Sequence, residues 1–111
     1  MITIFHNPRC SKSRETLALA EAAATRLGET LSIVEYLKTP PDLATLTRLQ
    51  QELSLPARAL LRDGETPYAE LGLSDPGLSD QALLQAVAAH PVLLQRPVVV
   101  RGERAVIGRP P

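Results

Sequence analysis

The chain has 111 residues, 44% of them hydrophobic, and its twelve basic residues balance twelve acidic ones. This length suits a single domain over residues 1–111, and the zero net charge excludes the strong positive field that attracts nucleic acid or anionic membranes. The single cysteine excludes an internal disulfide and a dithiol redox pair within the chain.

The first third of the sequence predicts a strand, a helix and a second strand. Ile2–Phe5 is short, apolar and β-branched, which is typical of a buried strand. A helix with the Ala-rich segment "LALAEAAA" follows, with Ser11 or Ser13 as its expected N-cap and Gly28 as its stop signal. Leu31–Tyr36 predicts the next strand. The three elements form a βαβ unit with parallel strands.

The remainder predicts a group of helices and then a hairpin. Leucines recur at helical spacing behind a cap at Asp42. Shorter helical segments are expected over 57–62 and 66–73, and another helix begins at Ser79 and ends at His90. "PVVV" and "RAVI" flank a tight turn at residues 101–103. The pattern indicates an α/β thioredoxin-like three-layer sandwich, in which a βαβ unit and a C-terminal β-hairpin form a mixed sheet interrupted by a helical insertion.

Cys10 lies where the first strand gives way to the first helix. The N–H groups and dipole of a helix N-terminus favour a thiolate and also bind oxyanions, and Arg9, Lys12 and Arg14 add positive charge. The alternative is a small buried core residue, which a setting such as "PRCSK" disfavours. Because Ser13 stands at the resolving position of "CSKS", a covalent adduct on Cys10 needs an external thiol.

The two histidines suggest no metal site. His6 either orients the thiol of Cys10 or closes the strand by bonding to backbone, and the sequence leaves both open. His90 is expected to end a helix. One cysteine and two distant histidines have no recognised ligand spacing, so we expect no metal and no bound cofactor. The sequence shows neither a signal-peptide pattern nor a run of the roughly 20 apolar residues that cross a bilayer. A cytoplasmic protein without a membrane partner is therefore expected.

Five segments carry a resemblance to a known family. "FHNPRCSKSRETL", "YLKTPP", "RALLRDGETPYAELGL", "HPVLLQRPVVV" and "IGRPP" occur in this order and span nearly the whole chain. In this set the sequence resembles the glutaredoxin-dependent arsenate reductase family, which has a thioredoxin fold. The family's best-known members carry small residues around the cysteine and usually continue beyond the position of Pro111. Arg9, Ser11 and Lys12 therefore indicate a sister branch.

The resemblance implies a set of site residues and partners. It implies arsenate or a similar oxyanion as substrate, glutathione as co-substrate and glutaredoxin as partner protein. Glutathione would attack the arsenic adduct, and glutaredoxin would remove the glutathionyl group. The matching residues are the nucleophile Cys10, the oxyanion-binding Arg62, Arg96 and Arg109, the neighbouring His6 and Arg14, and Pro97 at the cis-proline position. From the residues alone each of these three arginines would be assigned to the solvated surface, as Arg58 and Arg101 are.

Two other functions remain open at this stage. A glutathione-linked monothiol oxidoreductase without arsenate activity would need only Cys10 and the region of Pro97. A redox-regulatory binding module would share the fold, although such switches usually carry the second cysteine that "CSKS" lacks.

Overall fold

The computed structural model describes residues 1–108, so Arg109 lies outside the described residues. The chain forms two compact units, of which unit 1 comprises Met1–Thr39 together with the chain from Arg96 onward, and unit 2 comprises Pro40–Gln95. The single domain expected over residues 1–111 stays a prediction. Within the described part, no helix has the length and apolar character needed to span a membrane.

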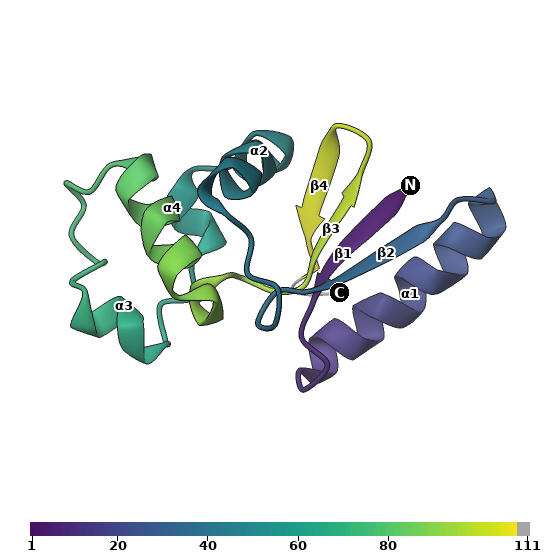
Figure 1. Cartoon of the computed structure of the whole chain (residues 1–111), viewed down its shortest axis with the longest axis horizontal. Helices are drawn as coiled ribbons and strands as arrows, with labels where there is room; N and C mark the ends of the chain where they lie inside the picture. Colours follow the sequence, from purple (N-terminus) through teal and green to yellow (C-terminus); the bar gives the residue numbers. More distant parts are fainter. Residues whose placement is uncertain (109–111) are drawn as a thin grey trace. The chain divides into compact units, whose positions relative to one another are not determined.

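Unit 1 is a four-stranded mixed sheet with one long helix (Figure 1). The sheet order is β2-β1-β3-β4, with β1 parallel to β2 and antiparallel to β3, and β3 antiparallel to β4. The predicted α/β class, βαβ unit, hairpin and helical insertion are confirmed. In chain order the elements of unit 1 are β1 (Ile2–His6), α1 (Ser11–Leu27), β2 (Leu31–Glu35), β3 (Val98–Arg101) and β4 (Arg104–Ile107).

Helix α1 presents small side chains to the sheet. Its buried residues are Ser13, Thr16, Ala20 and Ala24, which recur every three or four positions on one face. Small side chains allow the helix to lie close to β1 because little volume separates the two backbones. Gly28 ends the helix with a φ of 67°, a left-handed conformation that glycine adopts at little cost.

The predicted serine N-cap of α1 is wrong. Cys10 occupies the N-cap position, and no side-chain hydrogen bond caps the helix there. The hydroxyl of Ser13 instead accepts a hydrogen bond from the backbone N–H of Asn7 and bonds the ring of His6. Ser13 is therefore committed to the chain that enters the helix.

Unit 2 is the helical insertion between β2 and β3. The predicted caps are confirmed, because Asp42 accepts from the Thr45 N–H at 2.8 Å and Ser79 accepts from the Ala82 N–H at 3.1 Å. Its elements are α2 (Leu43–Leu53), the 3₁₀ helix η1 (Ala57–Leu60), α3 (Thr66–Glu70), α4 (Asp80–Ala89) and the 3₁₀ helix η2 (Pro91–Leu93).

The helix expected over 57–62 ends early. η1 stops at Leu60 because Leu61 forms an isolated antiparallel bridge with Leu94. The Arg62 N–H donates to the Leu93 carbonyl at 2.7 Å as part of the same pairing. A strand-like partner distant in sequence therefore replaces the last helical bonds.

Arg58 is a structural residue, and its assignment to the solvated surface is wrong. Its guanidinium donates to the Tyr68 hydroxyl at 3.0 Å and to the carbonyls of Leu73 at 2.6 Å and Asp75 at 2.8 Å. These bonds tie η1 to the loop after α3. Arg101 is exposed as expected and pairs with Glu29, its Nε lying 2.8 Å from Oε2.

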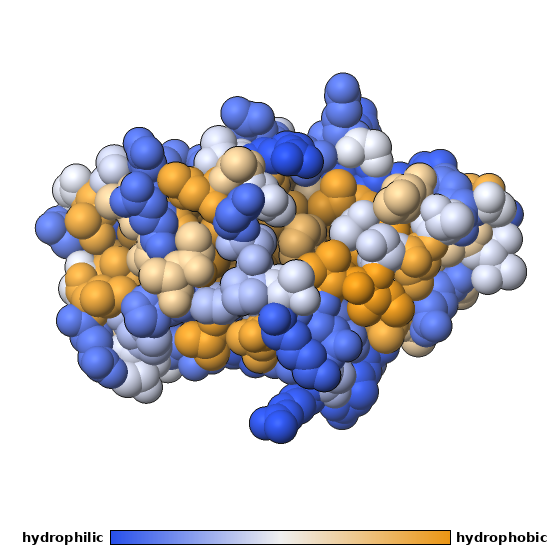
Figure 2. Space-filling view, viewed as in Figure 1, coloured by the Kyte–Doolittle hydropathy of each residue, from blue (hydrophilic) through white to orange (hydrophobic). Residues whose placement is uncertain are grey.

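Apolar side chains also reach the surface of unit 1. Figure 2 shows apolar surface over β2, which is an edge strand of the sheet. Ile33 on this strand is 47% exposed.

Gly108 lies against Thr16 and Pro97. Its N–H donates to the Pro97 carbonyl at 2.8 Å, which extends the pairing of β4 with β3. A Cβ atom at position 108 would lie 3.0 Å from both Thr16 Oγ1 and Pro97 Cγ. Both neighbours are buried, so neither has free space to move into.

We expect Gly108→Ala to lower the free energy of unfolding by about 1–3 kcal/mol, because the added methyl overpacks this contact. Chemical denaturation measures the loss. Gly64→Ala is the matched control, since a Cβ there meets nothing within 4 Å. Adding Thr16→Ala to Gly108→Ala should recover part of the loss. Equal stability of Gly108→Ala and the parent would contradict this packing.

Candidate functional site

Cys10 is held at the start of α1 by a tight turn. Its N–H donates to the Asn7 carbonyl at 3.0 Å, and its own carbonyl accepts the first helical bond from the Arg14 N–H at 3.0 Å. The thiol is free and half-buried. The sulfur therefore lies at the positive end of a 17-residue helix, where first-turn N–H groups have no acceptor within the helix.

Ser13 connects the end of β1 to the first turn of α1. Its Oγ lies 2.7 Å from His6 Nδ1 and accepts from the Asn7 N–H at 3.0 Å. His6 is 5% exposed and Ser13 is 0% exposed, so these bonds replace bonds to water. Because Oγ already accepts from Asn7, we infer that its proton goes to Nδ1, which leaves the ring proton of His6 on Nε2.

His6 is therefore bonded differently from either expectation. It ends β1, but its ring contacts a side chain of α1 instead of backbone. Burial lowers the pKa of His6 below its ordinary value of 6.5; nearby Glu35 opposes this shift and Arg14 adds to it. The imidazole is neutral at neutral pH and does not add positive charge near Cys10.

Arg14 braces the loop that precedes Cys10. Its Nη1 donates to the Pro8 carbonyl at 2.9 Å. The Arg9 N–H donates to the Asn7 side-chain oxygen at 3.0 Å, a short-range turn within the same loop. Arg14 thus places a permanent positive charge beside the loop and restrains its shape.

Arg96 and Pro97 lie at the same end of the sheet as this loop. The peptide bond between them is cis, as the cis-proline position implied. Phe5 pairs with Val98, and continuing this antiparallel register by one residue places Pro97 opposite His6. Arg96 Nε is buried and has no hydrogen-bond partner among residues 1–108. A buried guanidinium donor without an acceptor is costly unless a ligand supplies one.

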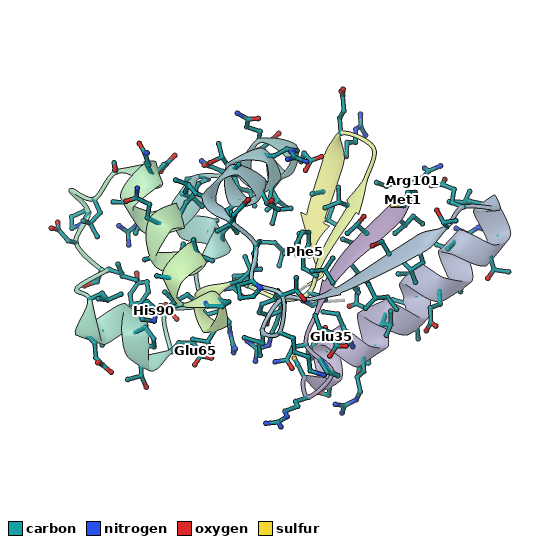
Figure 3. The ribbon with its side chains drawn as sticks, viewed as in Figure 1. Met1, Phe5, Glu35, Glu65, His90 and Arg101 are labelled. Carbon is teal, nitrogen blue, oxygen red and sulfur yellow. The ribbon has the colours of Figure 1, made fainter. Side chains whose placement is uncertain are left out.

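Arg62 belongs to unit 2. Its Nη1 contacts Glu65 Oε1 at 2.8 Å, and the two side chains are 24% and 28% exposed; Figure 3 labels Glu65 at α3. Of the predicted site residues, unit 1 brings five to one end of its sheet. These are His6, Cys10, Arg14, Arg96 and Pro97.

Sequence reasoning missed the role of Ser13. It treated this residue as a cap or as a silent resolving position. The available signal was its spacing, three residues after Cys10 and seven after His6, which places it on the sheet-facing side of the first helical turn. Within residues 1–108, no three or more His, Cys, Asp and Glu side chains are grouped so that they could hold a metal ion.

A model of the ArsC family matches residues 5–111. The chain belongs to the ArsC family. The resemblance carried by the five segments is therefore confirmed. The arsenate reductase of Neisseria meningitidis serogroup A is 48% identical over 98% of this chain and 91% of its own length. The uncharacterized protein YfgD of Escherichia coli K12 is 49% identical over 99% of this chain and 90% of its own length.

A solved structure supports the ArsC fold for the whole chain. The arsenate reductase from Vibrio cholerae superposes with a TM-score of 0.89 at 48% identity, covering 98% of this chain and 90% of its own. The thioredoxin-like α/β class expected from the sequence is confirmed.

The buried His6 predicts a pH-dependent stability. In the folded chain its pKa lies below the ordinary 6.5, so as the pH falls below that value the unfolded chain takes up a proton that the folded chain resists. The free energy of unfolding should therefore fall as the pH is lowered from 6.5, and the loss is complete below the folded pKa. Denaturant titrations at several pH values measure this slope.

The matched variant is His6→Asn, which keeps a hydrogen-bonding atom at the δ position but does not titrate. It should show a flatter pH dependence over the same range. The remaining slope reports the other titrating groups. An unchanged slope would show that His6 does not control acid stability.

Proposed function

We propose that this ArsC-family chain is an arsenate reductase in which the thiolate of Cys10 is the nucleophile. The observation that carries the proposal is a free, half-buried cysteine at the head of α1, in a chain 48% identical over nearly its full length to a protein named arsenate reductase. Its lone thiol fits a reaction that begins with one covalent adduct.

Arsenate is held by positive groups around Cys10. The first-turn N–H groups of α1 and the buried Nε of Arg96, which has no acceptor among the described residues, are suited to bind its oxygens. Arg62 and Arg109 join them on the strength of the family motifs. The thiolate attacks arsenic, forming a sulfur–arsenic bond, and one arsenate oxygen leaves as water after taking up protons. The cations stabilise the charge that gathers on the remaining oxygens.

Two external thiols complete the reduction. Glutathione condenses with the adduct, forming a second sulfur–arsenic bond. A glutaredoxin thiolate then attacks the glutathionyl sulfur, and the electron pair of the broken sulfur–arsenic bond reduces arsenic(V) to arsenic(III). Hydrolysis of the remaining Cys10–arsenic bond releases arsenite and restores the thiol. In total, arsenate and two thiols become arsenite, one mixed disulfide and one water.

This chemistry implies a reducing compartment. We place the protein in the cytoplasm, where glutathione and thioredoxin systems keep thiols reduced. Catalysis uses glutathione as a co-substrate and no bound cofactor or metal.

A glutathione-linked monothiol oxidoreductase is the second candidate. It is favoured by the Arg62–Glu65 contact at 2.8 Å, because a carboxylate on that guanidinium competes with an oxyanion. In this case Cys10 forms mixed disulfides with glutathione, and arsenate is not turned over.

We expect arsenate-dependent NADPH oxidation in the presence of glutathione, glutaredoxin and glutathione reductase, and Cys10→Ser should abolish it. Serine lacks a nucleophile that ionises at neutral pH, so the first bond cannot form. The blank without arsenate is the control. Mixed-disulfide formation on Cys10 without arsenate turnover would support the oxidoreductase, and full activity of Cys10→Ser would require another nucleophile.

Arg96→Leu should weaken arsenate or phosphate binding by about 1.5–3 kcal/mol, the range for a hydrogen bond to a charged group. Titration calorimetry of the parent and the variant measures the difference. Arg48→Leu on the exposed side of α2 is the matched control and should bind both anions as the parent does. Unchanged anion affinity in a folded Arg96→Leu variant would remove Arg96 from the site.

A further inference from the structure

A cavity of about 260 Å³ lies beside the Cys10 loop within unit 1. Its walls are residues 7–9 after β1, residues 37 and 38 after β2, and the last residues of the two strands, His6 and Glu35. The volume is at the small end of ligand pockets and suits a short peptide better than a dinucleotide.

The sheet explains why the cavity forms at this place. β1 and β2 are parallel, and His6 pairs with Glu35 at their carboxyl ends, the edge at which open α/β sheets commonly bind ligands. Both exit loops are fixed by hydrogen bonds. The N–H groups of Lys38 and Thr39 both donate to the Glu35 carbonyl at 2.9 Å, and the Asn7 N–H is held by Ser13. The cavity is therefore a formed feature of the fold.

The charged groups on its walls form a recognisable pattern. Arg9 and Lys38 are cations and Glu35 is an anion, at the end of β2 as labelled in Figure 3. Lys38 Nζ lies 3.6 Å from Glu35 Oε1, and these side chains are 78% and 39% exposed, so their loose ion pair can open to a ligand. Leu37 is 45% exposed and adds an apolar wall.

These groups complement a small peptide with two carboxylates and one ammonium group. Glutathione carries this set, with a carboxylate at each end, an ammonium group at one end and a thiol at its centre. Arg9 and Lys38 match the carboxylates, Glu35 matches the ammonium group, and Leu37 can contact the aliphatic part.

The cavity is also within reach of the proposed nucleophile. Arg9 on its wall precedes Cys10, and adjacent Cα atoms are about 3.8 Å apart. An extended tripeptide spans about 10 Å. A peptide anchored in the cavity can therefore extend its central thiol toward an adduct on Cys10 while the oxyanion groups stay occupied.

We propose that this cavity is the subsite for glutathione, which holds the peptide by its two carboxylates through Arg9 and Lys38. The proposal rests on the proposed function for the role of the thiol, but not for its binding. It assigns to Lys38, Glu35 and Leu37 a part in selecting the reducing thiol that is separate from oxyanion binding.

The binding test uses S-methylglutathione, which cannot exchange with Cys10. Added at millimolar concentrations to the ¹⁵N-labelled Cys10→Ser chain, it should shift the amide signals of residues 7, 9, 37 and 38. Lys38→Gln should weaken binding about two- to fivefold, the range for an exposed ion pair, and Lys38→Glu should weaken it further by repulsion. Arg26→Glu, the same charge reversal at the exposed far end of α1, should bind as the parent does. Shifts confined to other residues, equal effects of both reversals or no shifts at all would overturn the proposal.

The turnover test separates this subsite from the activity itself. In the coupled assay, Lys38→Glu and the cavity-filling Leu37→Trp should raise the KM for glutathione while leaving the KM for arsenate unchanged. Turnover with an unchanged glutathione KM in both folded variants would overturn the subsite and leave the proposed function standing. Binding of S-methylglutathione in a chain without arsenate turnover would overturn the proposed function and leave the subsite standing.

Discussion

The buried hydroxyl of Ser13 is the constraint on which the geometry of unit 1 depends. One oxygen atom accepts from the Asn7 N–H and contacts His6 Nδ1, so it ties the last residue of β1 and the following loop to the first turn of α1. Ser13 is 0% exposed, and losing either bond would leave a buried polar group unsatisfied. The direction in which α1 leaves the sheet, and with it the position of Cys10, follows from this junction.

The same residue explains why the proposed chemistry needs outside thiols. A cysteine at position 13 could resolve an adduct on Cys10 within the chain, but Ser13 uses its side chain to hold the loop. His6 does not supply charge either, since burial lowers its pKa. Positive potential at the thiol must come from the N-terminus of α1 and from guanidinium groups such as Arg14, whose charge is permanent. The architecture thus separates support of the loop from stabilisation of an anion.

The fold was largely predictable because its signals are local. Periodicity marks α2 and α4, Asp42 and Ser79 cap them, and a short turn joins β3 to β4. The errors come from contacts distant in sequence or from competing side chains. Leu61 leaves the helical pattern to bridge Leu94.

The site was predictable to the same degree. Cys10 could be placed from its strand–helix junction alone. Arg96 could not, because only the pairing of β3 with β1 brings it to that end of the sheet, and its role was inferred from family motifs. The arginines of this neutral chain differ in how many of their donors are already used. A guanidinium has five N–H donors. Arg58 spends several on neutral oxygens of unit 2, which fixes it as structure, whereas Arg62 bonds one carboxylate oxygen and Arg96 keeps a buried Nε without a partner among residues 1–108. An anion gains most where donors are already desolvated and uncommitted, since it then supplies bonds that neither water nor protein provides. Donor occupancy, and not net charge, therefore ranks Arg96 first and excludes Arg58 as an oxyanion ligand.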